Sequence, residues 1–388
     1  MANGVNRRSL FQLAGAAALL RSRLAGAQQP KPPAQMPPDL PPTPPRRPMS
    51  FGGHTEDFPA PDYRSTVAIA QGDQRRKNVY TSLKSIDKEL QAKMKGRKYV
   101  VIKPNFVNTT NQLAASHVDS MRGILDYLSE SFKGPVVIAE SSAGDTKDAF
   151  DNFKYSALTS EYRRQQLKLI DLNDEAKFER VAILDSDLHI VPCRIAARLV
   201  DPEAFVISAC MLKTHNTVIA SLSIKNMVLG APLHQATKET TRWNEKRKFH
   251  VGLRQTHYNM MVTAQRLNWG ASLIDGYEGM EGNGPNSGTP VASRIALAST
   301  DYVAADRVAA ETMGIDPEWL GYVKYCGDLG LGQFDGSKID VIGAKVADVK
   351  KSYRMHPDIE RELKWRGPLT ELPFNLGWVQ ALGYTREG

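Results

Sequence analysis

The chain has 388 residues, of which 24% are charged, and a formal net charge of +8 at pH 7. Most of this excess lies before residue 49, because segments 1–27 and 28–48 carry +4 and +2 and leave about +2 for the remainder. The body of the protein is therefore too weakly basic for charge to indicate a nucleic-acid partner, and none is expected.

Residues 1–27 have the organisation of an export signal. Arg7 and Arg8 precede a short Ala/Leu stretch that cannot span a membrane, and residues 25–27 form a small-residue cleavage site. The paired arginines favour recognition by the twin-arginine export machinery, and an ordinary basic n-region of a general secretory signal is the alternative. Either route predicts a periplasmic or extracellular mature protein without a stable membrane span.

A proline-rich linker follows the signal. Ten of the nineteen residues from 30 to 48 are proline, which predicts a stiff extended spacer, and an irregular entry continues to residue 63. We therefore expect a signal at 1–27 and a linker at 28–63. A single α/β domain is predicted for 64–345, with a C-terminal extension at 346–388 packed on it.

Short apolar runs alternate with amphipathic segments from residue 66 onward. Apolar residues at helical spacing predict helices, and short continuous apolar runs predict buried strands. The alternation predicts an α/β fold with a mostly parallel sheet that has helices on both faces. The predicted strands are 66–70, 99–102, 135–139, 168–171, 188–192, 204–209, 271–274 and 294–298. The predicted helices are 79–94, 121–132, 158–166, 218–228, 258–267 and 303–313.

Polar side chains follow five of the predicted strands. Ligands bind beyond the carboxyl ends of the strands in open parallel sheets, so these side chains are expected to gather along one edge. They are Lys103 and Asn105, Glu140, Lys213 and His215, Asp275, and Asp301.

The segment from 201 to 230 is predicted to form the floor of a site. Its apolar run 204–209 leads to Lys213 and His215, and Lys225 and Asn226 interrupt the next apolar stretch. Charged groups at the border of a buried run require partners, which a ligand can supply.

Several short motifs occur in a fixed order between residues 100 and 342. They are Lys103-Pro-Asn, Glu140-Ser, Leu212-Lys-Thr-His215, Lys225-Asn226, Asp275-Gly-Tyr-Glu-Gly-Met-Glu-Gly-Asn-Gly-Pro285, Ala298-Ser-Thr-Asp301 and Ala304-Ala-Asp306. As an ordered set they resemble the domain-of-unknown-function family numbered 362, over most of the mature body. The resemblance implies a fold and the position of a site rather than a reaction.

Some relatives in that family carry ferredoxin-like iron–sulfur cysteines, and this chain departs from them. Its three cysteines, Cys193, Cys210 and Cys326, are isolated and form no Cys-x-x-Cys pair. No iron–sulfur cluster is expected, and the spacing does not predict a disulfide.

Four residues are candidates for chemistry. Lys213 and Lys225 offer ammonium groups to a carboxylate or phosphate, and a desolvated lysine can act as a base or a Schiff-base nucleophile. His215 is the candidate for proton transfer, although His234, His250 and His257 compete for that role. Glu140 is expected to face the lysines. The alternatives are solvated lysines, a structural histidine and a glutamate at the start of a helix.

Further residues are candidates for binding. Lys103, Asn105, Asn226, Asn283 and Gly284 are predicted to contact the substrate, the last two through backbone amides on a turn.

A metal site is the other prediction for the glycine-rich segment that begins at Asp275. Together with Glu278 and Glu281, this residue can supply oxygen ligands to a divalent cation. Alternatively the glycines only permit a tight turn and the acids are caps, as Asp301 can be for a helix near residue 302.

The sequence favours an exported enzyme that acts on a small anionic organic molecule by lysine and histidine acid–base or metal-assisted chemistry. A binding protein that captures an anion or a metal without chemistry is the main alternative. An interaction protein tethered by the proline tract is the third. The serine-hydrolase elbow, the nucleotide-binding Walker loop and the dinucleotide fingerprint are all missing from the sequence.

Overall fold

The computed structural model of the chain describes residues 61–366. The predicted export signal and all but the last three residues of the predicted linker lie outside this range, as does the predicted extension from residue 367 onward. Among residues 61–366, no helix combines the length and the apolar character that crossing a membrane requires.

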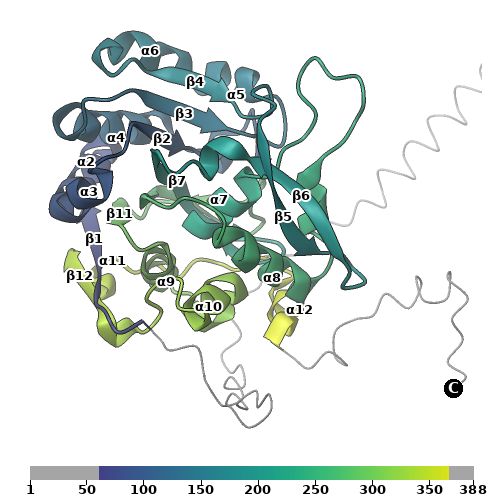
Figure 1. Cartoon of the computed structure of the whole chain (residues 1–388). Helices are drawn as coiled ribbons and strands as arrows, with labels where there is room; N and C mark the ends of the chain where they lie inside the picture. Colours follow the sequence, from purple (N-terminus) through teal and green to yellow (C-terminus); the bar gives the residue numbers. More distant parts are fainter. Residues whose placement is uncertain (1–60, 367–388) are drawn as a thin grey trace, which may run out of the picture. The chain divides into compact units, whose positions relative to one another are not determined.

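A large mixed sheet forms the centre of the fold, with strand order β12-β1-β11-β9-β7-β2-β3-β4 (Figure 1). The five neighbours β9, β7, β2, β3 and β4 are parallel, and β11 is antiparallel to both β9 and β1. The prediction of a mostly parallel sheet is confirmed. The strands on this path are β1 (Ser65–Gln71), β2 (Tyr99–Lys103), β3 (Val136–Glu140), β4 (Lys168–Asp171), β7 (Ala204–His215), β9 (Ala271–Glu281), β11 (Ile295–Ser299) and β12 (Ile339–Gly343).

Helices cover both faces of this sheet, as the sequence predicts (Figure 1). Apolar residues of α2, α3, α4 and α5 pack on one face, and those of α7, α8, α9 and α10 pack on the other. The helices are α2 (Arg75–Ser85), α3 (Asp87–Met94), α4 (Val118–Ser131), α5 (Thr146–Asn152), α6 (Leu158–Glu161), α7 (Ser223–Gly230), α8 (Leu253–Ala264), α9 (Tyr302–Thr312), α10 (Gly321–Asp328), α11 (Val346–Val349) and α12 (Ile359–Glu362).

The central strands are apolar on both faces because both faces are covered. In β2, Val101 faces one core, whereas its neighbours Val100 and Ile102 face the other, and all three are fully buried. The segment after residue 345 joins the first of these cores through residues such as Tyr353 and Ile359.

Three predicted elements differ from the observed ones. The predicted helix 79–94 is two helices, α2 and α3, which meet at Ile86. The predicted strand 188–192 belongs to a separate hairpin of β5 (Phe178–Leu184) and β6 (Ile190–Ala196) rather than to the main sheet. The predicted helix 158–166 is reduced to the four residues of α6 and a short 3-10 turn.

Two further differences lie close to the predicted site. The predicted helix 218–228 begins with the short strand β8 (Ile219–Ser221), and α7 starts only at Ser223. The glycine-rich segment that was expected to be a turn instead continues β9 to Glu281, where β10 (Thr289–Val291) pairs with it. The apolar pattern identified both regions but not the point at which each element begins or ends.

The two outer strands of the main sheet carry exposed charged residues. Lys168 is exposed on β4 at one edge. Asp340 is exposed on β12 at the other edge, where it pairs with Arg64.

Candidate functional site

The carboxyl ends of three adjacent parallel strands supply the basic and acidic residues of the site. Lys103 ends β2, Glu140 ends β3, and Lys213 and His215 are near the end of β7. Since β2 pairs with both β3 and β7, these ends lie side by side. All four side chains are buried.

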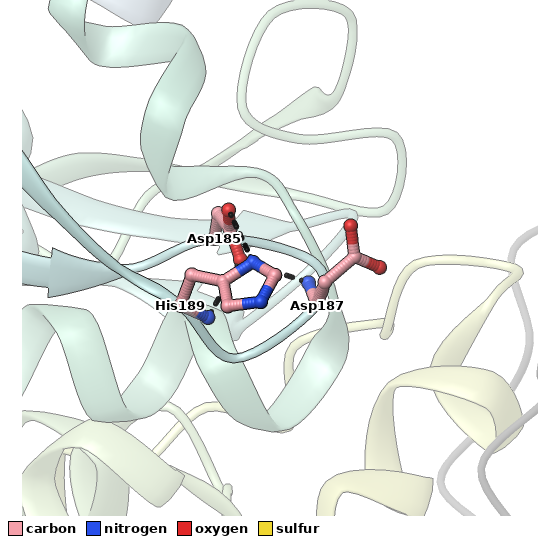
Figure 2. A group of neighbouring side chains, drawn as sticks. All are labelled: Asp185, Asp187 and His189. Carbon is pink, nitrogen blue, oxygen red and sulfur yellow. Dashed lines mark hydrogen bonds and ion pairs between the residues drawn. The ribbon is translucent and has the colours of Figure 1, made fainter.

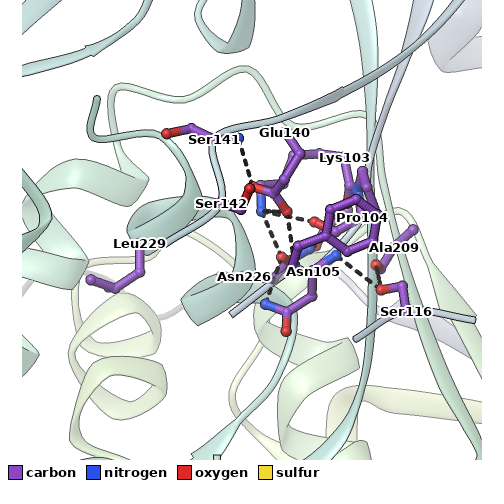
Figure 3. Close-up of polar contacts among 12 residues, drawn as sticks. Lys103, Pro104, Asn105, Ser116, Glu140, Ser141, Ser142, Ala209, Asn226 and Leu229 are labelled. Carbon is purple, nitrogen blue, oxygen red and sulfur yellow. Dashed lines mark hydrogen bonds and ion pairs between the residues drawn. The ribbon is translucent and has the colours of Figure 1, made fainter. Parts of the chain in front are cut away.

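Lys103 and Glu140 form a buried ion pair (Figure 3). Lys103 Nζ donates to Glu140 Oε2 at 2.8 Å, and both residues are 1% exposed. The remaining two N–H groups of Lys103 donate to Pro104 O and to Asn226 Oδ1, each at 2.8 Å. Glu140 also accepts from the backbone N–H groups of Phe106 and Ser141. Every donor of this ammonium is therefore satisfied within the protein.

Asn226 links the ion pair to the neighbouring residues. Its Oδ1 accepts from Lys103 and from Asn105 Nδ2, the latter at 3.1 Å. Its Nδ2 donates to Lys103 O at 3.1 Å and to Ser208 Oγ at 3.0 Å. Lys103, Asn105, Glu140 and Asn226 point toward one another in Figure 3. The amide thus uses all of its hydrogen-bonding groups to hold β2, β7 and α7 together.

Lys213 binds the oxygen of the Asn105 amide, whose nitrogen binds Asn226. Its Nζ donates to Asn105 Oδ1 at 2.6 Å and to Ala114 O at 3.0 Å, and the residue is 1% exposed. Burial and, to a smaller extent, the nearby charge of Lys225 together lower the pKa of Lys213 to about 7. This amine therefore exchanges its proton close to neutral pH.

Lys225 lies on α7 beside Asn226 and is 7% exposed. Among residues 61–366, no acceptor hydrogen-bonds to its amine, and since Nζ is not one of the fully buried atoms without a partner, it keeps contact with solvent. Burial lowers the pKa of Lys225 to about 8, with a contribution from the charge of Lys103. We refer to Lys103, Lys213 and Lys225 as the lysine cluster.

His215 is a neutral imidazole next to the lysine cluster. Its Nδ1 accepts from the backbone N–H of Thr217 at 3.0 Å, which leaves the proton on Nε2. Burial holds the pKa of His215 well below its ordinary value, and the charges of Lys225 and His250 lower it further. His215 is therefore a hydrogen-bond donor at Nε2 and not a cation.

Two of the competing histidines have structural roles. The ring of His234 bonds to Asn173 and to the backbone oxygens of Ser142 and Gln235. His257 is fully buried, and its Nδ1 accepts from Tyr322 N at 3.1 Å.

Helix α7 is held at both ends by residues outside it. At its start, the carboxylate of Asp306 accepts from the backbone N–H groups of Ser223 and Ile224, at 2.8 and 2.9 Å. At its end, a Cβ added to Gly230 would lie 2.1 Å from Lys103 Nζ. The ammonium of Lys103 at the end complements the helix dipole, whereas burial raises the pKa of Asp306 to about 8, so this group acts mainly as a hydrogen-bond acceptor. Asp301, by comparison, caps α9 through Val303 and Ala304, as the alternative reading expects.

The three acidic residues predicted to bind a metal do not form a group. Asp275 pairs with Arg75 at 3.0 Å and accepts from Ser120, on the face that α2 and α4 cover. Glu281 pairs with Arg354, and Glu278 is exposed on β9. Because β9 continues as a strand, its side chains diverge, and these three carboxylates do not converge on one point.

The predicted binding turn at Asn283 and Gly284 packs against the backbone of β7. A Cβ added to Gly284 would lie 2.0 Å from Thr214 O, so a close approach of two backbones explains the glycine. Thr214 Oγ1 also donates to Gly282 O at 3.0 Å. This turn therefore supports the strand that carries Lys213 and His215.

A different set of possible metal ligands lies on the hairpin of β5 and β6 (Figure 2). The ligand atoms of Asp185, Asp187 and His189 lie within 4.8 Å of one another, and this is the one such group within residues 61–366. However, Asp185 Oδ1 accepts from the backbone N–H groups of Asp187 and His189, both at 2.9 Å. These hydrogen bonds stabilise a turn, and the turn explains why the three side chains lie together.

Three residues near the cluster were not assigned to it from the sequence. Lys246, in the basic run 246–248, donates to Leu229 O and Pro232 O at 2.9 and 2.8 Å, and burial lowers its pKa to about 7. His250 and His356 are close enough for their charges to lower the pKa of His215. The basic run around Lys246 was the available signal for two of them, whereas no local pattern marks His356.

Comparisons with known proteins identify a family. A family model described as "Domain of unknown function (DUF362)" matches residues 100–311, which include Lys103, Glu140, Lys213 and Lys225. No curated protein matches the chain. A crystal structure of a Thermotoga maritima protein is similar over 53% of this chain and 51% of that one, about half its length, with 10% identity and a TM-score of 0.29. The last similarity is too low to support an argument about fold or function.

We predict that Glu140→Gln destabilises the fold by about 3–5 kcal/mol, because it leaves the Lys103 charge buried without its counter-ion. Denaturant unfolding of the variant measures this. Glu203→Gln is the matched control, because it breaks the exposed pair of Lys98 and Glu203 and should cost less than about 1 kcal/mol. Losses of equal size at the two pairs would contradict the prediction.

We also predict a pH-dependent stability difference at Lys225. Its pKa falls from 10.5 to about 8 on folding, so between these pH values the folded protein binds fewer protons than the unfolded chain. The contribution of Lys225 to the free energy of unfolding therefore increases with pH through that window. Below pH 8, the full destabilisation caused by burying the ammonium is present. Lys225→Met should be more stable than the wild type at pH 7, on the order of 3 kcal/mol, and lose this advantage near pH 10.5.

Denaturant unfolding of both proteins across this pH range is the measurement. Groups whose pKa values do not depend on Lys225 cancel in the difference between the two proteins, whereas Lys213, whose pKa the charge of Lys225 lowers, contributes to the difference near pH 7. A difference that does not change with pH would show that Lys225 titrates normally in the folded state.

Proposed function

Since the chain belongs to the family described as Domain of unknown function (DUF362), which prescribes no reaction, we propose a function from its site. The protein is an exported enzyme that binds a small organic anion at the lysine cluster and moves a proton on it. One observation carries this proposal: the amine of Lys225, a residue that is only 7% exposed, has no hydrogen-bond partner within residues 61–366 and lies near a second lysine whose pKa is about 7.

Anion binding follows from the unmet hydrogen-bonding needs of Lys225. Because the residue is only 7% exposed, its ammonium loses part of its hydration without gaining a protein acceptor, at roughly 1–3 kcal/mol for an unmade bond. A carboxylate or phosphate oxygen restores both the hydrogen bonds and the charge balance. Lys103 cannot play this part, because its three donors are already used.

Proton transfer is assigned to Lys213 and His215. A general base works best when its pKa is close to the working pH, and the pKa of Lys213 is about 7. The neutral amine can keep both hydrogen bonds, to Asn105 and Ala114, and still present its lone pair. His215 supplies an N–H donor at Nε2 for an oxygen of the substrate.

The other predicted residues have positioning roles in this proposal. Lys103, Glu140 and Asn226 fix the end of α7, and Asn105 orients Lys213. Glu140 was first considered for catalysis, but its two oxygens already accept from Lys103, Phe106 and Ser141. Asp275, Glu278 and Glu281 are given no role in the proposed reaction, because they have separate surroundings.

A protein that binds an anion without chemistry is the second candidate. The same unpartnered amine of Lys225 supports it, since capture alone requires no base. The two candidates differ in what Lys213 does, and an exchange measurement separates them.

We predict that the wild type catalyses hydrogen–deuterium exchange on a carbon acid, measured by proton NMR in heavy water with a panel that starts with pyruvate. Lys213→Met should reduce the rate at least ~10²-fold, because it removes the base. Inorganic phosphate and pyruvate should each raise the melting temperature of the wild type and of Lys213→Met, but not of Lys225→Met. Lys98→Met, at an exposed lysine, is the control. Stabilisation without exchange across the panel would support the binding protein instead.

We further propose that the twin-arginine route exports the protein. In a bacterium that has this route, the double variant Arg7→Lys, Arg8→Lys should remain in the cytoplasm, as cell fractionation and immunoblotting would show. Arg21→Lys together with Arg23→Lys keeps the same charge and should still be exported. Normal export of the first variant would favour the general secretory route.

A further inference from the structure

Lys225 differs from the other buried lysines of the site in the state of its amine. Lys103 donates to three acceptors, Lys213 to two, and Lys246 to two backbone oxygens. Among residues 61–366, the amine of Lys225 has none. Lys225 also retains 7% of its exposure, whereas Lys103 and Lys213 retain 1% each. It is therefore the buried amine that a small molecule can reach without breaking an existing bond.

The backbone under Lys225 is held rigidly. The preceding residue, Ile224, donates its N–H to Asp306 at 2.9 Å, and the following residue, Asn226, makes four hydrogen bonds. A reactive group needs such support, because small displacements of a nucleophile slow a reaction strongly. The amine of Lys225 is thus carried on a fixed turn of α7.

The surroundings of Lys225 keep its lone pair available. Lys103 adds positive charge, and His215, whose pKa the charge of Lys225 lowers, is neutral and supplies no counter-ion. A lysine that is desolvated next to another cation becomes a nucleophile at neutral pH. The same charges attract a carboxylate to the place where the amine lies.

We propose that Lys225 forms an imine with the carbonyl group of a 2-oxo acid, which names the substrate class of the site. This inference rests on the proposed function and extends it. A 2-oxo acid carries a carboxylate next to an electrophilic carbon, so it matches an anion-binding cluster that contains one free amine. The carboxylate accepts a hydrogen bond from His215 Nε2 while Nζ of Lys225 reaches the adjacent carbon.

The reaction balances without an added oxidant or reductant. The Nζ lone pair attacks the carbonyl carbon, and the C=O π electrons move to oxygen, which takes a proton from Nζ through His215 or water. The hydroxyl group then leaves as water after a second protonation, and nitrogen loses its remaining extra proton to form C=N. One molecule of water is released for each imine. Before nitrogen loses its last proton, the protonated imine withdraws electrons from the neighbouring carbon, whose proton Lys213 can remove.

Borohydride trapping tests the proposal on the full-length protein. Protein at pH 7 is incubated with pyruvate, reduced with sodium borohydride, digested and mapped by mass spectrometry. The expected adduct is on Lys225, at least ~10-fold above that on any exposed lysine, because its lowered pKa leaves more of the amine unprotonated. Lys213 and Lys246 are internal controls, since their amines are bonded although their pKa values are also lowered.

Lys225→Arg separates this inference from the proposed function. Arginine keeps the positive charge and forms no imine, so the variant should lose the adduct and still be stabilised by inorganic phosphate. An adduct that persists elsewhere in the variant at the wild-type level, or the absence of any adduct in the wild type, overturns the imine. If inorganic phosphate does not raise the melting temperature of the wild type, the proposed anion site itself is wrong.

Discussion

Everything at this site depends on one buried ion pair. Lys103 and Glu140 are both removed from water, and the desolvation cost of two charges is offset only when every remaining donor and acceptor is paired. The pair meets that condition: Lys103 uses three donors, and Glu140 accepts from the ammonium and from two backbone N–H groups. The ends of β2 and β3 therefore have one well-defined arrangement.

Asn226 connects this ion pair to α7 through its hydrogen bonds with Lys103. The amide is oriented by Lys103 and Asn105, so the register of α7 against β2 and β7 is fixed. Lys225 is the neighbouring residue, so its backbone position is also fixed, although its side chain makes no hydrogen bond within residues 61–366. The unpaired amine of Lys225 is thus positioned by Lys103 and Glu140, whose hydrogen-bonding groups are all paired.

Part of this site could be predicted from the sequence. Lys103, Glu140 and Lys213 follow apolar runs, and because the strands are parallel their ends meet. The same reasoning failed at Asp275, since β9 continues for six residues beyond it and directs the carboxylate toward Arg75 and Ser120. An apolar pattern gives neither the length of a strand nor its direction, which is why antiparallel β11 was also not foreseen. His356 comes near His215 only through folding of the C-terminal segment.

The charged residues at the outer strands have a consequence for self-association. Open sheets end in rows of unpaired backbone groups that can template the addition of another chain, and exposed charges at those rows oppose it. Lys168 occupies one border of the main sheet, and Asp340, held by Arg64, occupies the other. Two copies of the protein that approached border to border would have to bury these charges, so the sheet is protected against growing into an extended polymer.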